Sequence, residues 1–328
     1  MVVGVLRNGL KSALPVLIIF SFVVSIISLF STTNSLSDNS INIIYRILTG
    51  SIINRVGIVM INILVLVIGA ILLSYYSIRQ EVVDKQNYLP AFLYLFFGGM
   101  IMDCNLLHPS FFANIFIFLF LINITEAYRN EYVLSLVFNA AFFLSLALFF
   151  YINYAFFIPL FFICLIILRA FNWREWACGV LGLVAPVFMY ACICYLANYD
   201  FTEFISYTGL LFYYFQKPLI SEFFYPLFFM LIILLIFVVL RHSAVGFGSK
   251  IKTQKTTAIT YWMIVLTLIN FFSKNNNYYF PLIASVIPLS LLLGEYFFSI
   301  KKLKVANTLL FLLMTVGSLL FLVKLGAF

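Results

Sequence analysis

Charged residues are scarce in this chain of 328 residues: they account for 9% of it, against about 25% in a typical soluble domain. A folded surface that faces water needs more charge, so the scarcity excludes a water-soluble enzyme, a nucleic-acid reader and a disordered tail. Hydrophobic types make up 65% of the sequence and aromatic types 19%. The surface must therefore face lipid, and we expect an all-α fold, a polytopic transmembrane helical bundle.

Several sequence signatures are also absent. There is no G-x-x-x-x-G-K-[ST], no H-E-x-x-H, no G-x-S-x-G and no G-x-G-x-x-G. The five cysteines are odd in number and three fall in one apolar run, which argues against a disulfide framework. Cys192 and Cys194 form a C-x-C pair without a His or carboxylate in the run, so bilayer packing is the better interpretation and no metal site is predicted there. No span carries the paired mid-membrane acids that an ion-coupled pump would need.

Long apolar runs divide the chain into candidate membrane spans, since a helix needs about 20 apolar residues to cross about 30 Å of hydrocarbon. We predict about eleven spans, at residues 13–31, 56–76, 89–102, 110–124, 132–152, 154–169, 177–196, 223–240, 258–272, 278–299 and 305–325. Three of them are short, and residues 89–124 can also be interpreted as a re-entrant pair. Asn, Ser and Thr inside the runs are expected to serve helix packing.

The distribution of Lys and Arg predicts the orientation. With the N-terminus in the cytoplasm, fourteen of the nineteen basic residues fall in cytoplasmic segments and five on the opposite side. Cytoplasmic loops of membrane proteins carry such an excess, so we predict a multi-pass topology that is N-in and C-out, with an odd number of spans. The expected partner is the lipid bilayer, and nucleic acid is not a partner.

The polar segments suggest three regions. Residues 1–240 are expected to form a transmembrane core, 241–257 a basic, flexible cytoplasmic linker beside anionic headgroups, and 258–328 a set of supporting helices. The outer segment 32–55 differs from the other loops because apolar residues recur in it at helical spacing. We therefore predict an amphipathic helix at about 41–54 that lies in the outer interface.

Two acidic residues on the outer side are the candidates for catalysis. Asp38 precedes the interfacial helix, where its carboxylate could accept a proton from a hydroxyl acceptor or hold a divalent cation on a phosphate. Asp103 follows an apolar run in a tight turn, and an ionisable group near lipid is a candidate for function because it is costly there. Each also has a structural interpretation: Asp38 as a solvated turn residue, and Asp103 as an N-cap of the next helix.

Further outer residues are candidates for substrate binding. Arg46 and Arg55 could pair with a lipid phosphate, and they could equally snorkel to headgroups. Aromatic and acidic residues alternate in the loop 197–222, which would suit a sugar ring, although an aromatic belt explains the same pattern. Lys274 could contact a phosphate or lie in a plain loop. The full predicted set is Arg46, Arg55, His108, Asp200, Glu203, Tyr207, Lys217 and Lys274.

The inner turn FNWREW at 171–176 places two Trp beside an Arg, which is typical of an anchor at the bilayer surface. Together with the apolar span that follows, which contains Gly179, Gly182 and Pro186, this turn resembles an uncharacterised family of polytopic membrane proteins from Bacteroidota. The similarity extends along most of the chain. It implies a location in the bacterial inner membrane, and it implies no particular activity.

The layout of residues 1–240 also resembles the GT-C class of integral-membrane glycosyltransferases. Those enzymes start N-in and have a long first outer loop with interfacial helices and an early acid, which here is 32–55 with Asp38. A second acid often lies in the next outer loop, and here it is Asp103. The resemblance implies transfer of sugar from a polyprenyl-phosphate donor at the outer face. The first loop lacks the paired acids common in the class, since Asp38 stands beside Asn39. The resemblance therefore implies neither that a divalent cation binds nor that the protein is catalytically active.

These observations lead to three hypotheses from different classes. The leading one is a GT-C-like membrane protein that handles polyprenyl-phosphate-linked sugar, with Asp38 as general base or acceptor anchor, Asp103 as a second carboxylate and an arginine on the phosphate. The second is a non-catalytic membrane subunit or assembly factor with a membrane protein partner. The third is a transporter or flippase, which requires a polar path through the bundle.

Overall fold

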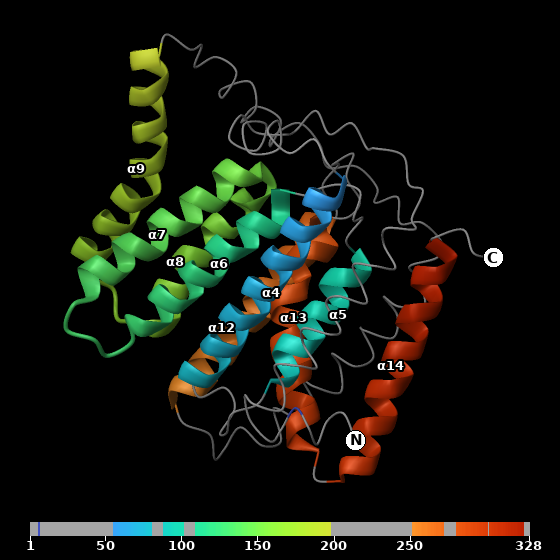
Figure 1. Cartoon of the computed structure of the whole chain (residues 1–328). Helices are drawn as coiled ribbons and strands as arrows, with labels where there is room; N and C mark the ends of the chain where they lie inside the picture. The colour runs from blue at the N-terminus through green and yellow to red at the C-terminus, as the bar shows by residue number, and fades with distance from the viewer. Residues whose placement is uncertain are drawn as a thin grey trace.

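The computed structural model describes residues 6, 55–80, 88–101, 109–197, 251–271, 280–300 and 302–324. Within these ranges every regular element is a helix and no strand occurs (Figure 1). The all-α prediction is confirmed for this part of the chain. The elements are α4 (Arg55–Arg79), α5 (Leu89–Ile101), α6 (Pro109–Glu126), α7 (Val133–Phe150), the 3-10 helix η1 (Ile152–Phe157), α8 (Ile158–Leu168), α9 (Trp173–Ala197), α12 (Ile251–Phe271), α13 (Phe280–Ser299) and α14 (Leu303–Lys324).

Four of these helices are long and apolar enough to cross a membrane. At a rise of about 1.5 Å per residue, about 20 residues cover the hydrocarbon layer. Shorter apolar stretches lie in α5, α8, α13 and α14. These helices fit a membrane protein, while the count of about eleven spans and the GT-C architecture stay predictions. The predicted spans 13–31 and 223–240 lie outside the described residues. The four candidates are Met60–Arg79, Pro109–Glu126, Val133–Phe150 and Trp173–Leu196.

Local sequence features explain several helix boundaries. α8 has a proline in its first turn, where the missing N–H would have no intrahelical partner anyway. At the start of α9 the backbone N–H of Arg174 donates to the side-chain oxygen of Asn172 at 3.2 Å, which satisfies one of the free donors of that end. Between α6 and α7 the chain reverses through Arg129, whose φ of 57° lies in the left-handed region.

α12 begins at Ile251, so residues 251–257, the last part of the predicted linker, are helical, while 241–250 lie outside the described residues. The threonines of this stretch occupy a buried face rather than a solvated loop. Their hydroxyls donate to carbonyls of the preceding turn, from Thr256 to Thr253 at 2.9 Å and from Thr260 to Thr257 at 2.7 Å. A threonine paired in this way can be buried without leaving a free hydroxyl, so a sequence of low hydropathy packs as a helix.

Polar contacts group the helix ends into two sets. Arg79 at the end of α4 forms an ion pair with Glu126 at the end of α6, with 3.0 Å between Nε and Oε1. Lys252, in the first turn of α12, donates to the main-chain oxygen of Arg79 at 3.4 Å. We call this the Arg79 end of the bundle. The first residues of α4 and α6 and the last residues of α12 consequently lie at the opposite end, which we call the Arg55 end (Figure 1).

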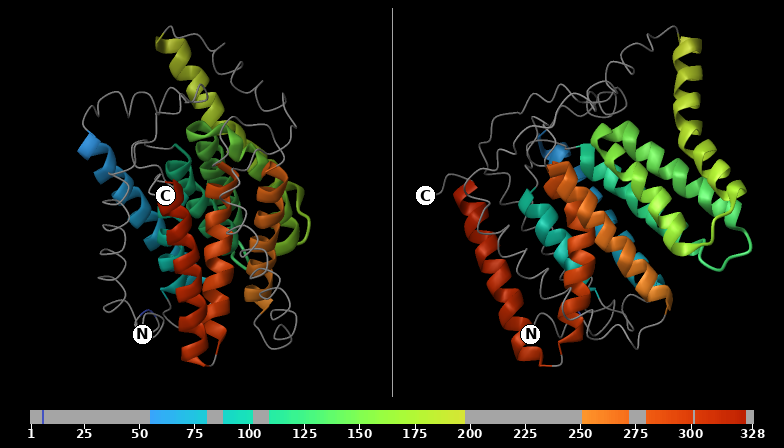
Figure 2. Two further views of the ribbon diagram at one scale, coloured as in Figure 1. Left: turned by 90° about the vertical axis from the view of Figure 1, so that its right-hand side faces the viewer. Right: turned by 180° about the vertical axis from the view of Figure 1, so that it is seen from behind.

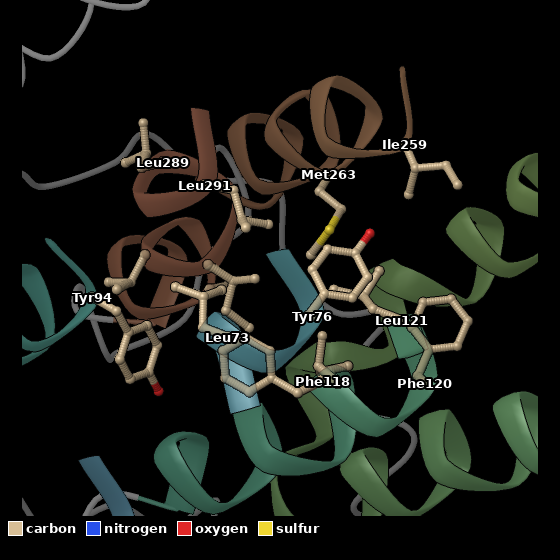
Figure 3. Packing of buried hydrophobic residues seen from close by; sticks show 14 of the residues in the cluster. Leu73, Tyr76, Tyr94, Phe118, Phe120, Leu121, Ile259, Met263, Leu289 and Leu291 are labelled. Carbon is tan, nitrogen blue, oxygen red and sulfur yellow. The ribbon is translucent and has the colours of Figure 1, made fainter. Parts of the chain in front are cut away.

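Aromatic and aliphatic side chains fill the core between α4, α5, α6, α12 and α13. Figure 3 shows Leu73 and Tyr76 of α4 between Phe118 and Leu121 of α6, with Met263 of α12 beside them. All five side chains are buried. These side chains from three helices form one buried, largely apolar core between the two ends of the bundle.

The helices at the margins of the bundle pack less completely. α9 and α14 lie at opposite edges of the described part of the molecule (Figure 2), and only 22% of the apolar stretch of α9 is buried. On α4, large apolar residues with exposed fractions of 36–57% recur every three or four positions, which places them on one stripe. Such exposed apolar faces fit contact with the lipid bilayer. The stripe of α4 consists of Met60, Leu64, Ile68, Ile71 and Tyr75.

Candidate functional site

Of the residues predicted to act in catalysis and binding, Arg55 alone lies within the described part of the chain. The structure neither brings them together nor separates them. Arg55 is the first residue of α4. The predicted interfacial helix at 41–54 and the other candidates lie outside the described residues: Asp38, Arg46, Asp103, His108, Asp200, Glu203, Tyr207, Lys217 and Lys274.

The described ends of α4 and α6 lie next in sequence to three of these positions: Arg55 begins α4, and Asp103 and His108 precede α6. Because the last turns of α4 and α6 are joined by an ion pair, their first residues, Arg55 and Pro109, lie at the same end of the bundle. His108 immediately precedes Pro109, and Asp103 belongs to the same connection between α5 and α6. Pro109, the first described residue after the segment that contains Asp103 and His108, therefore lies at the Arg55 end.

The ends of α9 and α12 extend this relationship. Arg169, which precedes α9, donates to the main-chain oxygen of Ala127 at 2.8 Å and pairs with Glu175 in the first turn of α9 at 3.3 Å. α9 therefore starts at the Arg79 end and finishes at the Arg55 end. Asp200 follows the last residue of α9 closely in the sequence, and Lys274 likewise follows α12.

A buried polar cluster lies in the half of the bundle nearer to the Arg55 end. The hydroxyl of Tyr154 in η1 donates to the side-chain oxygen of Asn114 and, at 3.3 Å, to the main-chain oxygen of Ser110, both in the first half of α6. Tyr94 of α5 lies beside Asn114, and the ring of Tyr151 meets that of Tyr154 edge-on, with centroids 6.3 Å apart. All five side chains are 0% exposed.

The composition of this cluster limits its chemistry. It combines phenol hydroxyls with an amide and has no carboxylate or ammonium group, so it forms hydrogen bonds but supplies no charged base. Interhelical hydrogen bonds of this kind hold membrane helices together. Gly69 of α4 makes room for it, since a Cβ there would lie 2.6 Å from the hydroxyl oxygen of Tyr94. The cluster therefore fixes the first turns of α6, next to the connection with Asp103 and His108.

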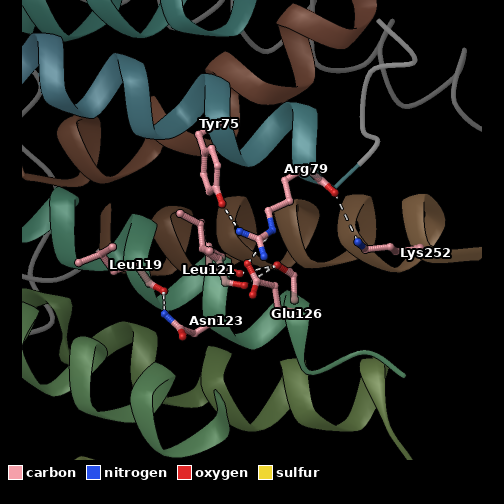
Figure 4. Close-up of polar contacts among 9 residues, drawn as sticks. Tyr75, Arg79, Leu119, Leu121, Asn123, Glu126 and Lys252 are labelled. Carbon is pink, nitrogen blue, oxygen red and sulfur yellow. Dashed lines mark hydrogen bonds and ion pairs between the residues drawn. The ribbon is translucent and has the colours of Figure 1, made fainter. Parts of the chain in front are cut away.

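Two ion pairs, Arg79 with Glu126 and Arg169 with Glu175, lie at the Arg79 end. Figure 4 shows Arg79 between Tyr75, whose hydroxyl accepts a hydrogen bond from Nη1, and the carboxylate of Glu126. The guanidinium also lies over the ring of Tyr75, 5.4 Å from its centroid. Lys252 completes the group through the main-chain oxygen of Arg79. Residues from α4, α6 and α12 thus meet at one corner.

Basic side chains also cap neighbouring helix ends. Lys255 donates to the main-chain oxygen of Leu168, near the end of α8, at 3.1 Å, and it lies 4.8 Å from the ring centroid of Tyr128. Cations near helix C-termini satisfy free carbonyls and oppose the partial negative charge of the helix dipole. These contacts explain why basic residues predicted to share one side of the membrane meet at the Arg79 end.

The FNWREW turn lies at the same end. Trp176 packs against Phe162 and Phe171, with ring centroids 5.4 and 5.3 Å apart. Trp173 is 67% exposed and has the guanidinium of Arg174 5.8 Å from its centroid. One tryptophan is therefore packed and the other faces outward, as expected for an anchor at a bilayer surface.

The buried cluster was not among the sequence-based candidates. Asn114 interrupts the apolar run of α6, and this interruption was the signal available. Its partner Tyr154 is 40 residues away in sequence, so no local pattern links the two side chains. Nothing distinguishes Tyr154 from the other nineteen tyrosines before the helices are packed.

Metal binding has no support within the described ranges. There, no group of three or more His, Cys, Asp or Glu comes together. Cys164, Cys178, Cys192 and Cys194 are free. Asp38 and Asp103 lie outside the residues covered by these statements.

Comparisons with known proteins give no further assignment. No protein-family model, curated protein or solved structure matches this chain.

Proposed function

We propose that this chain is a GT-C-like protein of the bacterial inner membrane that handles polyprenyl-phosphate-linked sugar at the face formed by the Arg55 end. In this proposal Asp38 is the general base or the anchor of the acceptor, and Asp103 is a second carboxylate. Arg46 or Arg55 contacts the phosphate of the donor. A divalent cation on the two carboxylates is an open part of the proposal.

The proposal is supported mainly by the positions of Arg55 and Pro109, which both lie at the Arg55 end of the bundle. Arg55 and Pro109, the residue that follows the segment with Asp103 and His108 in sequence, lie at the same end of the bundle, because α4 and α6 are paired at their other ends. A site that draws residues from separate connections needs them on one side of the membrane. The buried cluster of Tyr94, Asn114 and Tyr154 supports such a site by fixing the helix that follows Asp103.

The exposed face of α4 suits a lipid-linked donor. Its apolar stripe begins at Met60, five residues after Arg55, and runs along the helix to Tyr75. A prenyl chain that lies on this stripe would have its phosphate near Arg55, about 7 Å beyond the first apolar side chain at 1.5 Å per residue. This arrangement would leave the sugar in the aqueous layer, where outer carboxylates could act on it.

There are two alternative functions: a transporter or flippase, and a non-catalytic subunit or assembly factor. A flippase needs a polar path between the two ends, and along α6 the described side chains that separate Asn114 from Thr125 and Glu126 include the buried apolar Ile117, Phe118 and Leu121. This buried apolar stretch disfavours a polar path across the membrane beside α6. A non-catalytic subunit or assembly factor is favoured by the exposed apolar face of α9, which could contact a membrane protein partner instead of lipid.

The catalytic proposal is tested by Asp38→Asn and Asp103→Asn in cells, with lipid-linked sugars and surface glycans as the readout. General acid–base catalysis contributes about 100-fold or more to rate, so each variant is expected to lose that much flux. Glu131→Gln at the Arg79 end is the matched control, since it removes one exposed carboxylate. If both aspartate variants match the wild type while a deletion strain is defective, Asp38 and Asp103 are not catalytic.

Convergence of the two carboxylates is tested separately in a cysteine-free background. The pair Asp38→Cys and Asp103→Cys is expected to be cross-linked by a short bifunctional thiol reagent. The control pair Asp38→Cys and Glu131→Cys is expected to stay uncross-linked, because Glu131 follows α6 at the Arg79 end. Absence of the first cross-link, with both thiols reactive toward a monofunctional reagent, would count against a shared site.

A further inference from the structure

The stripe of exposed apolar residues on α4 ends at a cationic corner. The stripe runs from Met60 to Tyr75, and Arg79 follows Tyr75 by one helical turn. Tyr75 is 45% exposed and the side chain of Arg79 is 47% exposed. An acyl chain lying on this stripe would therefore bring its headgroup to the level of Arg79. Tyrosine and arginine at the end of an apolar face mark the depth of the headgroups in a bilayer.

At this corner, the N–H groups of Arg79 and Lys252 outnumber the acceptors that the described residues provide. The guanidinium of Arg79 uses Nε for Glu126 and Nη1 for Tyr75, out of five N–H groups. The ammonium of Lys252 has three N–H groups, and one of them is directed at the main-chain oxygen of Arg79 at 3.4 Å. Lys255 adds a further cation one turn along α12. Among these four described side chains, the three cations Arg79, Lys252 and Lys255 are accompanied by one carboxylate, that of Glu126.

We propose that Arg79 and Lys252 bind the phosphate of an anionic phospholipid whose acyl chain lies along the α4 stripe. The phosphate oxygens accept hydrogen bonds from the remaining N–H groups, and Glu126 holds the guanidinium toward the corner from the other side. The phosphate site lies at the opposite end of the bundle from the proposed sugar site. Both proposals use the apolar stripe of α4, but the lipid-retention test below does not depend on Asp38, Asp103 or Arg55.

Charge complementarity and the position of the stripe decide between occupants. A soluble phosphate would use the cations alone, whereas a phospholipid uses the cations together with the apolar face that leads to them. A zwitterionic lipid presents its own ammonium group beside the phosphate, which reduces the attraction. The anionic phospholipid is the occupant that matches both the charge and the apolar surface.

The test uses the full-length protein in detergent micelles, with lipid retention measured by native mass spectrometry in titrations with phosphatidylglycerol and phosphatidylcholine. The wild type is expected to retain one phosphatidylglycerol in preference to phosphatidylcholine. Each cation near a membrane surface contributes about a fivefold change in binding. Lys252→Gln is therefore expected to weaken retention about fivefold and Arg79→Gln/Lys252→Gln about 25-fold.

The matched control is Lys302→Gln/Lys304→Gln, which removes the same charge from exposed positions at the start of α14. It is expected to change retention less than about twofold, since it is remote from the stripe of α4. Lys252→Gln keeps the ion pair with Glu126, so it tests the proposal even where the double variant fails to fold. Equal losses in the control and in Lys252→Gln, or equal retention of the two lipids by the wild type, would overturn the proposal. Displacement of the lipid by inorganic phosphate at equal concentration would also overturn it, in favour of a soluble-anion site.

Discussion

Gly182 in α9 packs directly against the main-chain carbonyl oxygen of Phe138 in α7. A Cβ at position 182 would lie 2.6 Å from that oxygen and 2.8 Å from the Cβ of Ala141. The two backbones thus approach as closely as glycine allows, which is how small residues stabilise helix pairs in membranes. Since the outer face of α9 is largely exposed, this close contact with α7 is one of the main attachments of α9 to the bundle.

Gly182→Val is expected to separate α9 from α7. The added side chain meets main-chain atoms, which cannot rotate away, so we expect a loss of about 1–3 kcal/mol in the free energy of unfolding. Thermal unfolding of the purified protein in detergent measures this loss. Leu181→Val is the control, because Leu181 is the next residue and is 64% exposed. Equal stability of the two variants would show that α7 and α9 are not in close contact.

Tyr154 and Asn114 are expected to stabilise the bundle as a coupled pair. Tyr154→Phe removes the donor and Asn114→Leu removes the acceptor, and either change alone leaves the buried partner without this bond. A double-mutant cycle by thermal or denaturant unfolding should give a coupling energy of about 0.6 kcal/mol, with about 1.7 kcal/mol as an upper bound. Tyr195→Phe, at a residue that is 84% exposed, should leave stability unchanged. Strictly additive effects of the two changes would refute the contact.

Exchanging the charges of Arg79 and Glu126 tests the parallel arrangement of α4 and α6. Arg79→Glu places two carboxylates together at the Arg79 end, and adding Glu126→Arg restores an opposite pair. A partly exposed ion pair contributes up to about 1 kcal/mol, so the single variant should lose about that much and the double variant should recover part of it. The effect should shrink at high salt because ions screen exposed charges. If the double variant is no more stable than the single one, the two helix ends do not meet.

The sequence allows many of the helices to be predicted because their apolar character alone determines them. The run that contains Gly182 and Pro186 was predicted as a span at 177–196, and α9 includes all of it. The basic residues Arg79, Arg169 and Lys252, predicted to share one side of the membrane, are connected by contacts at one end of the bundle.

Tertiary contacts determine the features that the sequence did not predict. Thr253 and Thr256 lower the average hydropathy of residues 251–257, and the pairing of the Thr256 hydroxyl with the carbonyl of its own helix becomes visible only once α12 is packed. The contact between Tyr154 and Asn114 joins two elements separated by α7, so its prediction would require the packing of α6 against η1. Asp38 and Asp103 stay predictions, since both lie outside the described residues.

The central claim is that the two ends of this bundle lie on opposite sides of a membrane, with the Arg55 end outside. Tyr132, between α6 and α7, and Tyr195, near the end of α9, are 78% and 84% exposed, and each is replaced by cysteine in a cysteine-free background. A membrane-impermeant thiol reagent is expected to label Tyr195→Cys in intact cells and Tyr132→Cys only in inside-out vesicles. Labelling of both positions from the same side, or the reverse assignment, would contradict the account.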